Sequence, residues 1–281
     1  MRPLQIALRF VRCALTFAVL GTVATLATAQ ESSLRRLDSR DDTRGWEAVG
    51  QLKLGGHGFC TGALIAEDLV LTAGHCLFDK ATGAPIDPGA IQFLAGWRNG
   101  KAEAYRAIKR AVSHPDYVYQ AAPDPAMVRF DVAILQLSDP IRDGVVNPFA
   151  VDAQPVPGAE VGVVSYAHDR SDAPSLQRVC RVRDRMSEVL VMSCAVDFGA
   201  SGSPVFSFGY GRPRIVAVVS AKATMGGEKV SLAADLDEVL PVLKARLRAE
   251  IGLPQAGQGA ARVSTLGERR TIGAKFIRPG G

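Results

Sequence analysis

Residues 197–206 have the sequence DFGASGSPVF, which surrounds Ser201 with small residues before an apolar run begins. A serine hydroxyl in such a stretch can act as a nucleophile when a neighbouring base activates it. The small residues also let the backbone N–H groups of Gly199 and Ser201 point into one cavity, where a developing oxyanion could be stabilised. A short cluster of glycine and serine is more often a plain loop, so the assignment depends on the rest of the chain.

Two further residues supply the chemistry that a serine nucleophile needs. His75 lies in LTAGHC, directly after an apolar strand pattern, and Asp131 opens the apolar run DVAILQL. A carboxylate at the mouth of a buried run needs hydrogen-bond partners, and a histidine N–H is one that also makes use of it. Alone, each residue has an ordinary interpretation: a buried structural histidine, a turn cap and a loop serine. Together they predict acyl transfer, with His75 as the base, Asp131 orienting it and Ser201 as the nucleophile.

The other histidines have structural interpretations. His57 in GGHGFC is expected to be a solvated loop residue, and His114 in SHPDY a structural residue of a turn. His168 in YAHDR lies in a polar turn, where ligand binding is the less favoured alternative.

The ends of the chain differ from its body. Residues 1–29 combine arginines, an apolar run and the small residues Ala27-Thr28-Ala29, which predicts a cleaved signal peptide. The alternative is a membrane anchor, but the apolar run is short for a bilayer span. We therefore expect a secreted or periplasmic protein without a stable membrane anchor. Residues 30–45 are expected to be an N-terminal segment or a short propeptide ending at Arg40 or Arg44.

The net charge of +5 is concentrated outside the body of the chain. The arginines of the signal peptide and a basic, flexible tail at 254–281 account for it. Aromatic residues make up only 6% of the chain, so the basic face with interleaved aromatics that nucleic-acid binding needs is not predicted. We expect a monomer whose partner is a peptide or protein substrate.

One of the five cysteines, Cys13, lies in the signal peptide, and four remain. An even number in an exported protein is most simply explained by disulfides. No pair has C-x-x-C spacing, so neither a metal site nor a cofactor is predicted. Three pairings are open. The most local one joins Cys60 with Cys76 and Cys180 with Cys194, closing loops of about fifteen residues that each stabilise the fold by about 3 kcal/mol.

Short β-rich runs punctuated by turns fill residues 46–235, which predicts an all-β sandwich or barrels. These runs are FCTGALI, LVLTA, IQFLAGW, YRAIKRAV, DVAILQL, EVGVVSYA, LQRVCRVR, EVLVMSCAV, SPVFSF and RIVAVVSA. A turn-rich segment at 138–158 divides the body into a first half, 46–150, and a second half, 151–253. Helical periodicity follows at 236–251, with a regular helix expected to begin at Pro241.

The order of the three reactive residues distinguishes two enzyme classes. Histidine, aspartate, serine is the order of the chymotrypsin-type triad, whereas α/β-hydrolases have serine first and a G-x-S-x-G turn. With CTGALI, LTAGHC, DVAILQL, GASGSPV and IVAVVSA in sequence, the chain resembles the chymotrypsin-fold (trypsin-like) serine proteases over about residues 46–250. Among them its G-x-S-G-S-P motif is most similar to the bacterial glutamyl endopeptidase branch.

The resemblance implies a fold and further residue roles. It implies two six-stranded antiparallel β-barrels with the active site between them, followed by the C-terminal helix. His75 and Asp131 would come from the first barrel and Ser201 from the second. Ser220 in VVSA would support the aspartate, and the 60–76 pairing would match the family's histidine-loop disulfide.

Departures from the family pattern concern activation and specificity. Ala200 stands where trypsin-like members have the aspartate that binds the new N-terminus after zymogen cleavage. The predicted substrate pocket consists of Ala195, Val196, Val219 and Lys222. Ala195 replaces the acid that selects lysine or arginine, and Val219 replaces the histidine of the glutamyl branch. We therefore expect small or aliphatic residues before the scissile bond, although Lys222 at the rim could favour an acidic one.

The sequence thus predicts a secreted serine endopeptidase that acts through an acyl-enzyme. Two alternatives stay open: a non-catalytic secreted binding module on the same fold, and a secreted serine esterase.

Overall fold

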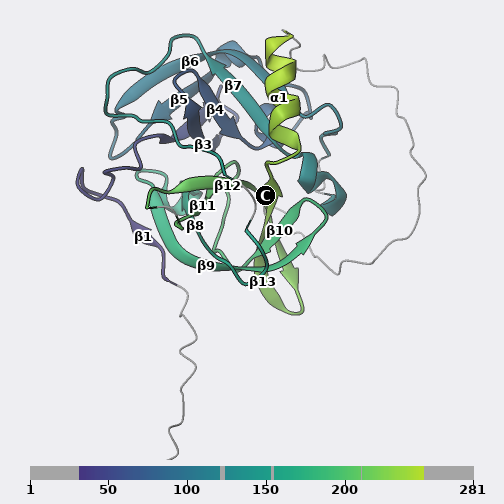
Figure 1. Ribbon diagram of the computed structural model, residues 1–281. Helices are drawn as coiled ribbons and strands as arrows, with labels where there is room; N and C mark the ends of the chain where they lie inside the picture. The colour runs from purple at the N-terminus through teal and green to yellow at the C-terminus, as the bar shows by residue number, and fades with distance from the viewer. Residues whose placement is uncertain (1–31, 121–123, 153–154, 210, 250–281) are drawn as a thin grey trace, which may run out of the picture. The chain divides into compact units, whose positions relative to one another are not determined.

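The computed structural model describes residues 32–120, 124–152, 155–209 and 211–249, and these residues form mainly antiparallel β-structure (Figure 1). The signal peptide predicted at 1–29 and the tail predicted at 254–281 lie outside the described residues. Within the described ranges, no helix has the length and apolar character that a bilayer crossing requires.

The first barrel is a closed ring with the strand order β2-β3-β4-β7-β6-β5. Its strands are β2 (Val49–Leu54), β3 (Phe59–Ala66), β4 (Leu69–Thr72), β5 (Ile91–Ala95), β6 (Ala104–Ser113) and β7 (Ala133–Leu137). Large apolar side chains fill it, among them the fully buried Leu64, Phe93 and Ile134. The burial of this apolar surface is the main force that holds the ring closed.

The second barrel has the order β9-β10-β13-β12-β11-β8 and is closed by a β8–β9 pairing. Its strands are β8 (Glu160–Ser165), β9 (Ser175–Met186), β10 (Val189–Met192), β11 (Pro204–Ser207), β12 (Arg214–Met225) and β13 (Glu228–Asp235). The short strand β1 (Arg35–Arg36) is added to β9 outside this ring. The prediction of two six-stranded antiparallel barrels is therefore confirmed.

An aromatic cluster joins the two barrels. Trp46 precedes β2, Phe149 lies in the connection between the barrels, and Phe206 lies in β11. The ring of Phe206 lies 5.0 Å from that of Trp46 and 4.7 Å from that of Phe149. All three side chains are buried in one core cluster with residues of both barrels. Edge-to-face packing of this kind adds specific attraction to the burial of apolar area.

The C-terminal helix α1 (Val239–Arg248) packs on β6 and β7 of the first barrel (Figure 1). Its buried residues Val239, Leu240, Leu243 and Leu247 repeat at helical spacing. The expectation that regular helix begins at Pro241 was wrong, because α1 begins at Val239. Pro241 lies in the first turn, where a backbone N–H has no intrahelical partner and its loss costs nothing.

Candidate active site

Asp131 and His75 lie at the same end of the antiparallel strand pair β4 and β7 and are joined by two hydrogen bonds. His75 lies in the 3-10 helix Gly74–Leu77, which follows β4, and Asp131 lies two residues before β7. The His75 Nδ1 atom lies 2.7 Å from Asp131 Oδ2, and the His75 backbone N–H donates to Asp131 Oδ1 at 2.7 Å. Ser220 on β12 of the second barrel donates its hydroxyl to Oδ2 at 2.5 Å. The buried carboxylate is thus paired from both barrels.

Gly74 and Tyr117 shape the space around this carboxylate. A Cβ atom at Gly74 would lie 3.2 Å from Asp131 Oδ1 and 3.2 Å from the Tyr117 ring, so a larger residue would crowd both. Burial, together with the nearby negative charge of Asp131, raises the pKa of Tyr117 well above its ordinary value. Tyr117 therefore stays a neutral phenol beside the carboxylate.

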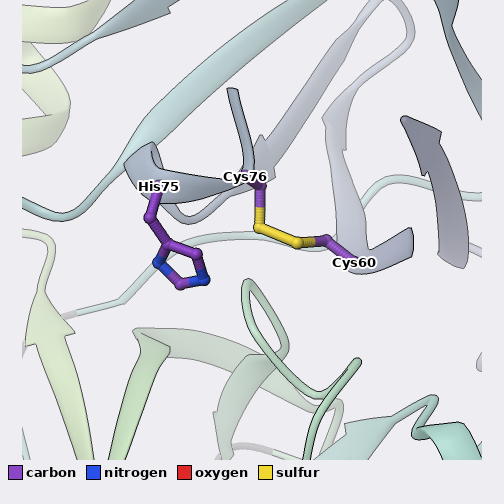
Figure 2. Close-up of side chains that lie close together, drawn as sticks. All are labelled: Cys60, His75 and Cys76. Atoms are coloured by element: carbon purple, nitrogen blue, oxygen red, sulfur yellow. A yellow bond between two sulfur atoms is a disulfide. The ribbon is translucent and has the colours of Figure 1, made fainter. Parts of the chain in front are cut away.

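A disulfide fixes the segment that carries His75. Cys76, the next residue, is bonded to Cys60 at the start of β3, and the imidazole lies beside this bridge (Figure 2). The nitrogen and sulfur ligand atoms of His75, Cys60 and Cys76 lie within 4.8 Å of one another. Because both sulfurs are shared in the disulfide, they offer no thiolate to a metal ion.

The second disulfide joins Cys180 and Cys194 within the second barrel, with 5.1 Å between their Cα atoms. Both bridges are the local pairings that the sequence favoured, and this prediction is confirmed. Disulfides are typical of proteins that function outside the reducing cytoplasm.

The loop that carries Ser201 contains two glycines in the left-handed region, Gly199 at φ +93° and Gly202 at φ +79°. A Cβ at Gly199 would approach the Phe59 ring to 2.4 Å, and one at Gly202 would approach Thr72 Oγ1 to 2.1 Å. Neither contact is possible for a real side chain, so the loop lies against the first barrel only because both positions are glycine.

Two N–H groups of this loop, those of Gly199 and Ser201, have no acceptor among the described residues. The carbonyl that precedes Gly199 accepts from the His168 N–H at 2.8 Å, and the carbonyl that precedes Ser201 accepts from the Ser203 N–H at 3.1 Å. In a trans peptide the N–H points opposite to the carbonyl, so the N–H groups of Gly199 and Ser201 point away from these partners. Among the described residues, neither N–H donates a hydrogen bond.

Short links bring Ser201 to the His75–Asp131 pair. The Ser201 carbonyl accepts from the Thr61 N–H at 2.9 Å. Thr61 is next to Cys60, which is disulfide-bonded to Cys76, the residue after His75. On the other side the loop is hydrogen-bonded to Val219 of β12, the residue before Ser220. The three residues predicted to form the triad therefore lie in one region of the described structure.

The residues predicted to line the substrate pocket differ in exposure. Val219 is buried and Val196 is half-buried, whereas Ala195 is exposed and donates its N–H to Gln177 Oε1 at 2.7 Å. All three side chains are short and apolar.

Lys222, the fourth of these residues, is paired in the structure. Its Nζ donates to Asp197 Oδ1 at 2.7 Å and lies 4.0 Å from the centre of the Phe198 ring. This hydrogen bond from Lys222 is the main reason why the pKa of Asp197 is lowered. The sequence interpretation missed Asp197, so it treated Lys222 as a free cation.

The remaining histidines have separate environments. His57 is largely exposed and pairs with Asp79, and His114 is buried against Phe130 with its ring 4.9 Å away. His168 lies in the short polar 3-10 turn His168–Arg170, as the sequence indicated, and its ring stacks on Phe59 at 5.2 Å beside the Ser201 loop.

The family model for the trypsin-like peptidase domain matches residues 60–218. The chain belongs to this family. Proteins or peptides are the substrates that a peptidase family implies.

Similar proteins of known sequence come from animals and bacteria. The chain is 30% identical over 176 residues to serine protease 23 of Mus musculus, covering 55% of this chain and 44% of that protein. It is 28% identical over 157 residues to glutamyl endopeptidase of Bacillus licheniformis, covering 53% and 45%. The chain thus spans less than half the length of these relatives.

Two solved structures share the fold at 17% identity. A Glu endopeptidase in complex with MPD matches with a TM-score of 0.63, covering 75% of this chain and 95% of the other. A scabies mite inactivated protease paralogue matches with a TM-score of 0.61, covering 79% and 98%. These two likenesses concern the fold.

Proposed function

We propose that this protein is a secreted serine endopeptidase that hydrolyses peptide bonds through an acyl-enzyme. The observation that carries the proposal is the buried Asp131 carboxylate, which accepts hydrogen bonds from the main-chain N–H and Nδ1 of His75 and from the Ser220 hydroxyl. A buried carboxylate held in this way fixes the imidazole with Nδ1 protonated, which leaves Nε2 as the base.

In the proposed mechanism, His75 Nε2 takes the proton of the Ser201 hydroxyl while its oxygen attacks the substrate carbonyl. Asp131 stabilises the imidazolium that forms, and the N–H groups of Gly199 and Ser201 bind the oxyanion. His75 then gives the proton to the leaving amine. Water, activated by the same imidazole, releases the acyl group and restores Ser201.

The proposed specificity is for small or aliphatic residues before the scissile bond. Ala195, Val196 and Val219 offer an apolar lining with no charged group. Lys222 is neutralised by Asp197 at 2.7 Å, so an acidic substrate side chain would have to compete with an ion pair already made. This pairing argues against the acidic preference that Lys222 would confer if it were free.

The test is a cleavage-site profile of the purified protein on a peptide library, beside the variant Ser201→Ala. We expect the wild type to cleave after small or aliphatic residues and the variant to be inactive. A fluorophosphonate should modify Ser201, and absence of modification would favour the non-catalytic binding module. Turnover of small esters without cleavage of any peptide would support the esterase and overturn the endopeptidase proposal.

A further inference from the structure

Thr61 on β3 holds the Ser201 loop with its side chain. Its hydroxyl donates to the Gly199 carbonyl at 2.9 Å and accepts from the Tyr166 N–H at 3.1 Å. The residue has no exposed surface, so water cannot replace either partner. A threonine hydroxyl has one proton to donate, and here that proton is directed at the glycine whose N–H faces the proposed oxyanion site.

The backbone of Thr61 holds the same loop a second time. Its N–H donates to the Ser201 carbonyl at 2.9 Å, and its carbonyl accepts from Thr72 Oγ1 at 2.8 Å. One residue of the first barrel therefore binds the carbonyl groups of both Gly199 and Ser201 in the second barrel. These two carbonyls belong to the Gly199–Ala200 and Ser201–Gly202 peptide groups. The Ala200–Ser201 peptide group, which carries the Ser201 N–H, lies between them, so both bonds from Thr61 restrict its orientation.

The described segment Gly199–Ser201 contains no charged side chain. The residue between Gly199 and Ser201 is Ala200, which is buried at 1% exposure and offers no side-chain partner. The Ala200 N–H closes a turn on the Asp197 carbonyl at 2.9 Å, which leaves the Gly199 carbonyl to the Thr61 hydroxyl. The Thr61 hydroxyl is therefore a neutral anchor of this segment across the barrel interface.

We propose that Thr61 is a positioning residue, whose hydroxyl presets the Gly199–Ser201 segment for oxyanion binding. The inference rests on the proposed function. Thr61 does not touch the reacting atoms, and it acts through the orientation of Gly199.

The variants Thr61→Val and Thr61→Ser separate positioning from packing. Valine has the shape of threonine but removes the hydroxyl, whereas serine keeps the hydroxyl and loses a methyl group. Because a misplacement of about 1 Å in a catalytic group costs about 100-fold in rate, we expect Thr61→Val to lose about 10- to 100-fold in kcat with little change in KM. Thr61→Ser should stay within about threefold of the wild type in kcat, since a serine hydroxyl has the same donor and acceptor capacity.

The control variant is Thr43→Val. Thr43 is another buried threonine, with 2% exposure, and its hydroxyl donates to main-chain carbonyls of the turn at 39–40. The variant Thr43→Val removes a buried hydroxyl by the same substitution, and Thr43 does not contact the Ser201 loop through that hydroxyl. We expect it to lower the melting temperature while kcat stays unchanged. Equal losses of kcat in Thr61→Val and Thr43→Val would show a general packing effect and overturn the proposal.

A measurement that does not depend on turnover keeps the inference apart from the proposed function. Hydrogen exchange of the peptide covering 197–203 should speed up at least about tenfold in Thr61→Val and stay unchanged in Thr43→Val, because a lost anchor permits local opening. If the wild type fails to react with a fluorophosphonate, the enzyme proposal fails, while the exchange rates still decide the role of Thr61. Unchanged exchange in Thr61→Val overturns the positioning role.

Discussion

The substitution Asp131→Asn would test the orientation of His75 with almost no change in volume. Asn keeps one oxygen and replaces the other with an NH2 group. The His75 backbone N–H, which donates to Oδ1 at 2.7 Å, can only donate, so the remaining oxygen must take the Oδ1 position. The NH2 group is then forced into the Oδ2 position, where it faces His75 Nδ1 at 2.7 Å.

Two donors cannot share a hydrogen bond, so the imidazole would change tautomer. Nδ1 would accept from the amide, and the proton would move to Nε2, the nitrogen that has to act as base toward Ser201. In a triad of this kind the corresponding substitution lowers kcat by about 10⁴. That factor corresponds to about 5.4 kcal/mol in the activation free energy.

Folding should be affected much less than catalysis. The Oδ1 bond is kept, and Ser220 can rotate its hydroxyl to accept from the new NH2 group instead of donating to Oδ2. We expect a loss of about 1.5–3 kcal/mol in the free energy of unfolding, the range for one hydrogen bond to a charged group.

The assay is steady-state hydrolysis of the best substrate from the library profile, with kcat and KM measured separately. Near-UV circular dichroism of the variant should match that of the wild type, and Ser201→Ala gives the background rate. A variant that folds normally and keeps kcat within tenfold of the wild type would refute the role assigned to Asp131.

Three further substitutions follow from the geometry. Gly202→Ala should lower the free energy of unfolding by about 3 kcal/mol in urea titrations and abolish fluorophosphonate labelling, because a Cβ at φ +79° meets an oxygen at 2.1 Å. Replacing Cys60 and Cys76 with serine should cost about 3 kcal/mol by thermal unfolding and also lower kcat, because the bridge holds the segment of His75. Burial lowers the pKa of His114, so the unfolded chain binds the proton first and stability should fall as the pH drops below about 6.5. His114→Asn should flatten this slope in melting temperatures measured against pH.

Each of these predictions has a control variant or an outcome that would contradict it. Gly209→Ala adds a Cβ that meets no atom within 4 Å, so it should leave both measurements unchanged. Serine at Cys180 and Cys194 opens a loop of similar length, with a separation of 14 instead of 16, but leaves His75 in place. Equal loss of kcat from the two disulfide variants would contradict the conclusion that the Cys60–Cys76 bridge holds the segment of His75. If the melting temperature of His114→Asn falls with pH as steeply as that of the wild type, another titrating group causes the pH dependence.

The strand pattern of the fold was readable from the sequence wherever apolar residues dominate a run. The strands β2 and β13 were not predicted, because their sequences, VGQLKL and EKVSLAAD, mix polar or small residues with apolar ones. In β13 the residues Ser231, Ala233 and Ala234 are buried all the same, with Ala233 in the core of the second barrel and Ala234 in the core cluster shared by both barrels. Closure of the rings depends on pairings between distant strands, and a single sequence carries no direct record of these.

The candidate site was predictable for residues whose chemistry is distinctive. His75, Asp131 and Ser201 have types and flanking patterns that suggest a role, and that role stays a prediction. Thr61 was not predictable, because a threonine inside a strand run is ordinary by type. Its position in the site follows from a contact between two barrels, 138 residues apart in the chain. Asp197 was missed for the same reason, since its partner Lys222 is far away in sequence.

The strand β1 covers a part of β9 that β10 does not reach. Arg35 and Arg36 pair with Leu176 and Ser175, whereas β10 pairs with β9 only from 182 onward. The main chain of Ser32 continues this cover with a bond to the Val179 carbonyl at 2.9 Å. A proteolytic cut that removed residues 32–36 would expose a row of backbone donors and acceptors, which is a template for strand addition from another molecule. Trimming at this end would then be expected to promote self-association, visible as a concentration-dependent rise in light scattering.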